Sequence, residues 1–132
     1  MTREGYRQTQ KINRGNVEQR KIAKLLDLVK DLGNLLSSNF PNYKFSIDLR
    51  RLAIGINLPT NNIIIEIISK KISNYEDNKD KIECVIYQTG VNYKTKEFER
   101  NLIKNYDILR NEILSFLVNY LDLKLKNYPR LP

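Results

Sequence analysis

Apolar residues recur at three- and four-residue steps through the first third of the chain. This spacing places side chains on one face of an α-helix. Asn16 is suited to cap such a helix, and Gln19 stands three residues later, as in a capping box. The pattern therefore predicts an amphipathic helix from Asn16 to about Ser37, whose apolar face carries Val17, Ile22, Leu25, Leu26, Val29, Leu32 and Leu36.

Alternating apolar and polar residues follow the helix, and their phase changes once. Residues 43–49 have apolar side chains at odd positions, whereas residues 52–58 have them at even positions. A shift of one residue turns a strand over unless a turn or a bulge intervenes. Arg50 and Arg51 lie at the change and supply no Gly or Asn for a tight turn. The pattern therefore favours one bulged or bent strand over a hairpin.

Two further strands are predicted downstream. Residues 59–62 have the composition of a hairpin loop, and Ile63–Ser69 is apolar on both faces, which is typical of a central strand. After a polar connection over residues 73–81, a second alternating run covers residues 82–87. These runs predict antiparallel strands joined in a meander.

The last apolar series has helical spacing. No Gly or Pro interrupts residues 95–126, so the pattern predicts a helix from Thr95 to Lys126. Such a helix would be about 48 Å long, whereas a compact domain of this size is roughly 36 Å across. Either the helix breaks, with Asp107 capping a second helix, or its far end packs on a second copy of the chain. The steps of four and three resemble a coiled-coil seam, and the residues predicted to form a dimer interface are Leu102, Tyr106, Leu109, Ile113, Phe116 and Tyr120.

The order of these elements predicts an α+β fold. It comprises an N-terminal helix, an antiparallel meander sheet of three to four strands and a long C-terminal helix. Residues 1–15 lack apolar periodicity, so we expect a flexible basic arm there, followed by a single domain over 16–126. Two prolines in residues 127–132 predict an extended C-terminal tail.

The excess positive charge lies at the two ends of the chain. The sequence has 23 Lys and Arg against 15 Asp and Glu, for a net charge of +8. Seven basic residues against two acidic ones stand in residues 1–24, and three basic residues stand in 124–132 without an acid. The region between them is neutral. Such basic ends predict an acidic partner.

Nucleic acid is the first partner that these charges predict. Phosphate contacts need positive charge and reach, and a helix induced in the arm would align its cations, which recur every three or four residues. We expect a small, basic, non-enzymatic protein that contacts the backbone of DNA or RNA and forms a homodimer through the C-terminal helix. The residues predicted to bind nucleic acid are Arg3, Arg7, Lys11, Arg14, Arg20, Lys21, Lys24, Arg50 and Arg51.

The residues available for catalysis are few. The chain has no His, and the single Cys84 lies on an apolar strand face, where a thiol is inert. The five glycines are too scattered for a phosphate-binding loop, so neither a cofactor nor a bound metal is expected. A metal-dependent nuclease that uses Asp48, Glu66 and Lys70 is a remote alternative, since Lys70 stands four residues after Glu66 and not two.

A protein-interaction module is the main alternative. The C-terminal seam and tail would then bind a protein partner, as in an adaptor, assembly factor or inhibitor. The abundance of Asn, Ile, Lys and Tyr is typical of AT-rich genomes, which include viral and mobile-element ones. No apolar run approaches the length of a membrane span. We therefore expect a cytoplasmic protein without a membrane partner.

Overall fold

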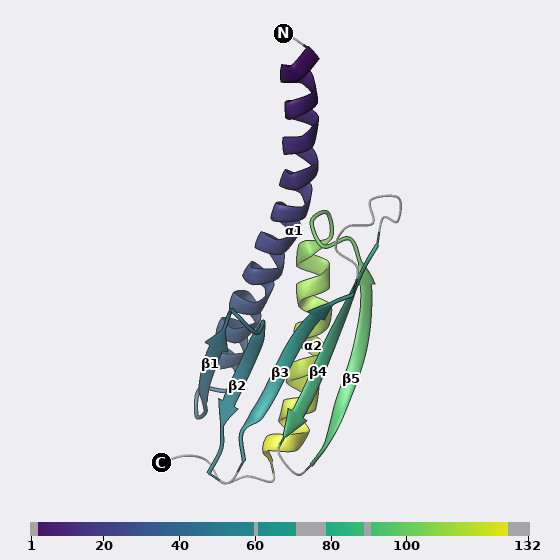
Figure 1. Ribbon diagram of the computed structural model, residues 1–132. Helices are drawn as coiled ribbons and strands as arrows, with labels where there is room; N and C mark the ends of the chain where they lie inside the picture. Colours follow the sequence, from purple (N-terminus) through teal and green to yellow (C-terminus); the bar gives the residue numbers. More distant parts are fainter. Residues whose placement is uncertain (1–2, 60, 71–78, 89–90, 127–132) are drawn as a thin grey trace.

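Two helices and five strands make up the computed structural model of the chain (Figure 1). The backbone is described for residues 3–59, 61–70, 79–88 and 91–126, and the side chains for residues 17–59, 61–70, 79–88 and 94–126. The elements, in chain order, are α1 (Arg3–Asn39), β1 (Lys44–Asp48), β2 (Ala53–Asn57), β3 (Ile63–Ser69), β4 (Asp80–Gln88), β5 (Val91–Arg100) and α2 (Tyr106–Leu125).

The strands form one antiparallel sheet in the order β1-β2-β3-β4-β5. Each strand pairs with the next one along the chain, so the sheet is a meander with β1 and β5 at its edges. The predicted α+β class, with a helix on either side of a meander in the sequence, is confirmed. The sheet has five strands where three to four were predicted.

One strand was missed at the phase change, which is a tight turn and not a bulge. Phe45 stands opposite Ile56 and Ile47 opposite Ile54, so β1 and β2 are separate strands. Leu52 turns the chain with a φ of 51°, a left-handed conformation that Gly or Asn usually provides. Asp48 Oδ1 accepts hydrogen bonds from the backbone N–H groups of Arg50 and Arg51, at 3.1 and 3.4 Å. An Asp side chain therefore stabilises a turn that the sequence pattern did not indicate.

The second missed strand is β5, which covers the predicted start of the last helix. Its residues pair with β4, with Lys96 opposite Cys84 and Phe98 opposite Ile82. The prediction of helix from Thr95 is wrong. The helix α2 begins at Tyr106, after the cap residue Asn105, so the alternative of a helix broken at Asp107 is also wrong, because a strand precedes α2. Asp107 lies in the first turn of α2, where a negative charge suits the helix dipole.

Helix α1 ends near its predicted end but begins earlier. It starts at Arg3 and not at Asn16, and Figure 1 shows its N-terminal part projecting beyond the sheet. Whether residues 1–15 behave as a separate arm stays a prediction. The predicted apolar face is buried over the second half of the helix, at Leu25, Val29, Leu32 and Leu36, together with Leu28.

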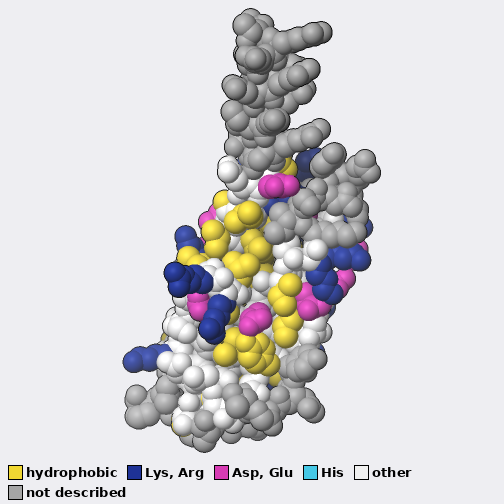
Figure 2. Space-filling view, viewed as in Figure 1, with side chains coloured by type: hydrophobic (Ala, Val, Ile, Leu, Met, Phe, Trp, Pro, Cys, Tyr) yellow, Lys and Arg dark blue, Asp and Glu magenta, His cyan; other side chains and the backbone are white. Residues whose placement is uncertain are grey.

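Both helices pack on one face of the sheet. The row of directly opposed Ile54, Ile65 and Ile86 is fully buried beneath them. Gly33 allows α1 to approach β1 closely, because a Cβ atom there would lie 2.5 Å from Cδ1 of Ile47. The other sheet face carries hydrophobic side chains near its middle and Lys and Arg side chains mainly along its flanks, as Figure 2 shows in the same view as Figure 1.

Candidate functional site

Four of the predicted nucleic-acid-binding residues lie in the projecting part of α1. They are Arg3, Arg7, Lys11 and Arg14, and their backbone is helical. Their side chains fall outside the described residues. The helical backbone that would align these cations is therefore present without a bound ligand.

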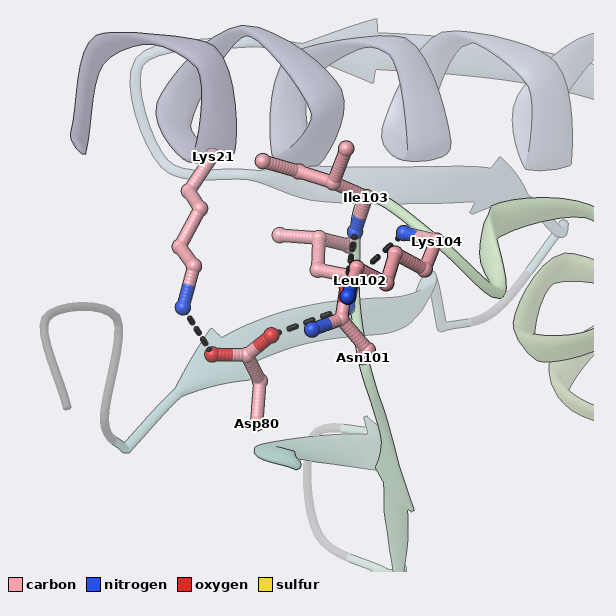
Figure 3. Close-up of polar contacts among 6 residues, drawn as sticks. All are labelled: Lys21, Asp80, Asn101, Leu102, Ile103 and Lys104. Carbon is pink, nitrogen blue, oxygen red and sulfur yellow. Dashed lines mark hydrogen bonds and ion pairs between the residues drawn. The ribbon is translucent and has the colours of Figure 1, made fainter. Parts of the chain in front are cut away.

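Lys21 holds the base of this projecting segment and is buried. Its ammonium donates a hydrogen bond to Asp80 Oδ1 at 2.7 Å, and the two side chains are 7 % and 2 % exposed (Figure 3). The second carboxylate oxygen of Asp80 accepts the backbone N–H of Leu102 at 2.8 Å. One carboxylate therefore joins α1, β4 and the connection from β5 to α2. The Lys21 ammonium is occupied inside the fold, so we remove this residue from the candidate interface.

The connection between β5 and α2 is shaped by a second polar side chain, that of Asn101. Its Oδ1 accepts the backbone N–H groups of Ile103, at 3.1 Å, and Lys104, at 2.7 Å (Figure 3). An Asn side chain in this role mimics a backbone turn. Asp80 and Asn101 thus accept hydrogen bonds from three successive backbone N–H groups of the connection, where it passes the base of the projecting helix.

Lys24 is half-buried beside this connection. Its Nζ lies 4.7 Å from the centre of the Tyr106 ring, in a cation–π contact. The Tyr106 hydroxyl donates to Asp31 at 2.5 Å. Burial, followed by this hydrogen bond to a carboxylate, raises the pKa of Tyr106. Lys24 remains partly exposed, so it stays in the candidate interface.

The remaining predicted cations, Arg20, Arg50 and Arg51, are exposed. Arg51 lies 3.8 Å from Asp48, with both side chains largely in solvent, and such a pair is weak. Arg20 and Arg50 form no ion pair with any described residue. Figure 1 places the β1–β2 turn, which carries Arg50 and Arg51, at the end of the sheet from which α1 projects. The described part of the candidate interface lies at this end.

The predicted dimer seam divides between the core and the surface. Leu102, Leu109 and Ile113 are fully buried in the core, and Tyr106 is 9 % exposed. Phe116 and Tyr120 are only partly buried. A dimer through the whole seam stays a prediction, but four of its six residues already pack within one copy of the chain.

Phe116 and Tyr120 instead line a groove between α2 and the edge strand β5. The groove has a volume of about 650 Å³, and Lys94, Lys96 and Phe98 of β5 form its other wall. Sequence reasoning missed this site because it placed residues 95–100 in a helix. Lys94, Lys96 and Phe98 share a face of the strand, since they stand two apart, but two of the three are charged, so no apolar alternation indicated a strand there.

The three residues of the alternative nuclease site do not come together. Glu66 accepts a hydrogen bond from the Tyr87 hydroxyl at 2.6 Å. Lys70 instead pairs with Glu83 at 2.8 Å and Glu97 at 2.9 Å, and these two carboxylates raise the pKa of its ammonium. Asp48 lies at the other edge of the sheet, on β1. Among the described residues no group of three or more acidic, Cys or His side chains is placed to hold a metal ion.

Cys84 is buried on the inner face of β4 and forms no disulfide. Burial raises the pKa of its thiol to about 12. At neutral pH the group is therefore a protonated thiol, without the thiolate that nucleophilic chemistry requires.

Comparisons with protein-family models, with curated proteins and with solved structures find no match to this chain. No helix in the described part of the chain is long and apolar enough to cross a membrane.

Proposed function

We propose that the protein is a non-enzymatic nucleic-acid-binding protein that contacts the phosphate backbone at the end from which α1 projects. The observation that carries the proposal is the continuity of α1, since one helix joins the core to the basic segment over residues 3–20. Eighteen residues of helix span about 27 Å. A preformed helix also avoids the entropic cost of ordering a flexible arm on binding.

Exposed cations of the domain extend this surface. Arg20 and Arg50 lack ion-pair partners among the described residues, and Arg51 has a weak one. Cations that are free of carboxylates can release counterions from nucleic acid when they bind phosphates. The proposed interface comprises Arg3, Arg7, Lys11, Arg14, Arg20, Lys24, Arg50 and Arg51.

A dimer through the seam is not needed for this binding surface, and substitutions of the buried seam residues would disturb the core. Substitution of Leu109 or Ile113 by Asp would place a charge in the core. A loss of nucleic-acid binding in such a variant would therefore report unfolding. Variants of exposed cations are the appropriate test.

The test is the salt dependence of binding to a labelled DNA duplex and to labelled RNA. A triple variant, Arg20→Ala with Arg50→Ala and Arg51→Ala, should weaken binding. The slope of log K against log salt should fall by about 0.7 to 0.9 for each phosphate that the protein no longer neutralises. The matched control replaces three other cations by Ala, Lys30, Lys44 and Lys94, which are exposed, form no ion pair with a described residue and lie outside the proposed interface.

The second arm of this test removes residues 1–14 from the chain. The slope should fall by up to about 3 to 4 units, since four cations are removed with this segment. Circular dichroism of each variant shows whether the domain remains folded. Absence of binding by the full chain at about 50 mM salt, or equal effects of the triple variant and the control, would contradict the proposal.

A further inference from the structure

The edge strand β5 lies beside α2 and forms a groove with it. β5 pairs with β4 on one side, and no described strand lies on its other side (Figure 1). Ile108 and Leu123 of α2 border the groove beside β5 and are 48 % and 69 % exposed. A strand added to β5 would lie about 4.8 Å beyond it, and its inward side chains would point to the same side of the sheet as those that line the groove. The groove therefore lies beside the position of a sixth strand.

Two lysines give this position a positive charge. Lys94, Lys96 and Phe98 share the inner face of β5, because they stand opposite the buried Ile86, Cys84 and Ile82. Neither lysine forms an ion pair with a described residue.

The acid that lines the groove does not neutralise these lysines. Glu112 is held by Arg100, whose Nε donates to it at 2.6 Å. The outer face of β5 differs from the inner face, since Glu97 and Glu99 are paired with Lys70 and Lys81. The unmatched charge of β5 thus faces the groove.

We infer that the β5 edge binds an extended acidic segment of a partner protein as a sixth, antiparallel strand. The backbone of the segment would pair with the free edge of β5, and alternate side chains would enter the groove. Acidic residues two apart would face Lys94 and Lys96, and an apolar residue would face Phe98. The outward residues would be neutral and polar, because Glu97 and Glu99 already have partners.

A second copy of β5 does not fit this edge. In an antiparallel pair of β5 strands centred on any residue from 94 to 98, two cations stand directly opposite each other on the inner face. For centres at residues 94 to 98 in turn, the opposed pairs are Lys94–Lys94, Lys94–Lys96, Lys96–Lys96, Lys94–Arg100 and Lys96–Arg100. Directly opposed like charges destabilise strand pairing. The last six residues of the chain fit no better, because they contain two prolines, one arginine and no acid.

A nucleic-acid strand is also a poorer match for the groove. The Lys96 ammonium lies 5.4 Å from the Phe116 ring centre, and that of Lys94 lies 5.7 Å from the ring centres of both Phe116 and Tyr120. These contacts occupy the ring surfaces on which a base would stack. A phosphate backbone also lacks the N–H groups that the carbonyl groups of a strand edge accept.

The test uses a fluorescent peptide with the sequence Thr-Val-Thr-Glu-Thr-Glu-Thr, titrated with the full chain. It should bind with the Val opposite Phe98 and should slow amide hydrogen exchange in β5. The double variant Lys94→Glu, Lys96→Glu should lose affinity on the order of tenfold or more and should prefer the peptide in which Lys replaces Glu. The control Lys30→Glu, Lys44→Glu makes the same charge change away from the groove and should leave the affinity within about twofold.

Backbone pairing is tested with two N-methylated peptides, each methylated at alternate residues. Only one set of alternate amides points toward β5, so one peptide should lose binding and the other should retain it. Equal affinity of both peptides, or equal effects of the groove and control variants, would overturn the proposal. It is also overturned if the acidic peptide does not bind and β5 is instead protected by a single-stranded oligonucleotide or by self-association of the chain.

Discussion

At the scale of single residues, the ion pair of Lys21 and Asp80 is the most buried of the described ion pairs. Two buried charges repay their loss of hydration only with good geometry and further hydrogen bonds. Asp80 meets this condition by accepting hydrogen bonds from Lys21 and from the backbone of Leu102. The partners are 59 residues apart in sequence, so the pattern around Lys21 indicates only another cation of a basic segment.

Lys21→Met should therefore destabilise the fold by about 3–5 kcal/mol, because it leaves the Asp80 carboxylate buried and unpaired. Asp80→Asn should have a similar effect through the unpaired ammonium. The double variant should lose less than the sum of the two single losses. Urea unfolding followed by circular dichroism measures all three free energies. Additive losses would show that the two side chains are not coupled.

At the scale of elements, the contact between α1 and β1 depends on the absence of a side chain at Gly33. A Cβ atom there would lie 2.5 Å from Cδ1 and 2.7 Å from Cγ1 of Ile47, but 3.8 Å from Ile54. The overlap thus involves one side chain, which is itself 38 % exposed. Helix propensity acts in the opposite direction, since Ala favours a helix by about 1 kcal/mol over Gly.

Gly33→Ala should destabilise the protein by up to about 2 kcal/mol, because an overlap cost of about 1–3 kcal/mol is offset by about 1 kcal/mol of helix propensity. In an Ile47→Ala background, which lacks both clashing atoms, the same substitution should be neutral or stabilising by up to about 1 kcal/mol. A double-mutant cycle by thermal or urea unfolding provides the comparison. The same loss in both backgrounds would mean that the helix, and not its contact with β1, determines the effect.

Elements whose burial follows a simple period could be predicted from the sequence. The buried half of α1, the alternating β4 and the apolar β3 are examples. β5 could not be predicted, because its stability comes from pairing with β4 and its charged residues show no apolar alternation beyond Phe98. The seam along α2 was expected to keep to one face, but a seven-residue repeat drifts by about 20° per heptad around a straight helix. Within α2 the seam begins in the core at Tyr106 and reaches the groove at Phe116.

The candidate sites could be predicted less fully than the fold. The cations of α1 and of the β1–β2 turn were found from charge alone, and Lys21 was included although it is buried. The groove remained hidden because it exists only where β5 and α2 are side by side. A surface of this kind requires the pairing of strands, which no local pattern in the chain encodes.

At the scale of the whole molecule, several groups resist deprotonation in the folded state. Burial raises the pKa of Cys84 to about 12, and burial and Asp31 raise that of Tyr106. Both groups bind their protons more tightly in the folded than in the unfolded chain. Their contribution to stability is therefore complete below the unfolded pKa values, which are about 8.5 for Cys and about 10 for Tyr. It is lost as the pH rises from these values toward the folded ones.

The free energy of unfolding should accordingly fall above about pH 9, with Cys84 accounting for about 1–2 kcal/mol of the loss by pH 10. Urea titrations at a series of pH values measure this slope. Cys84→Ala should flatten it between about pH 8.5 and 10, whereas Tyr106→Phe should flatten it only above about pH 10. The separation of the two ranges distinguishes these groups from the general loss of lysine charge, which both variants retain. An unchanged slope in Cys84→Ala would show that the thiol reaches solvent in the folded protein.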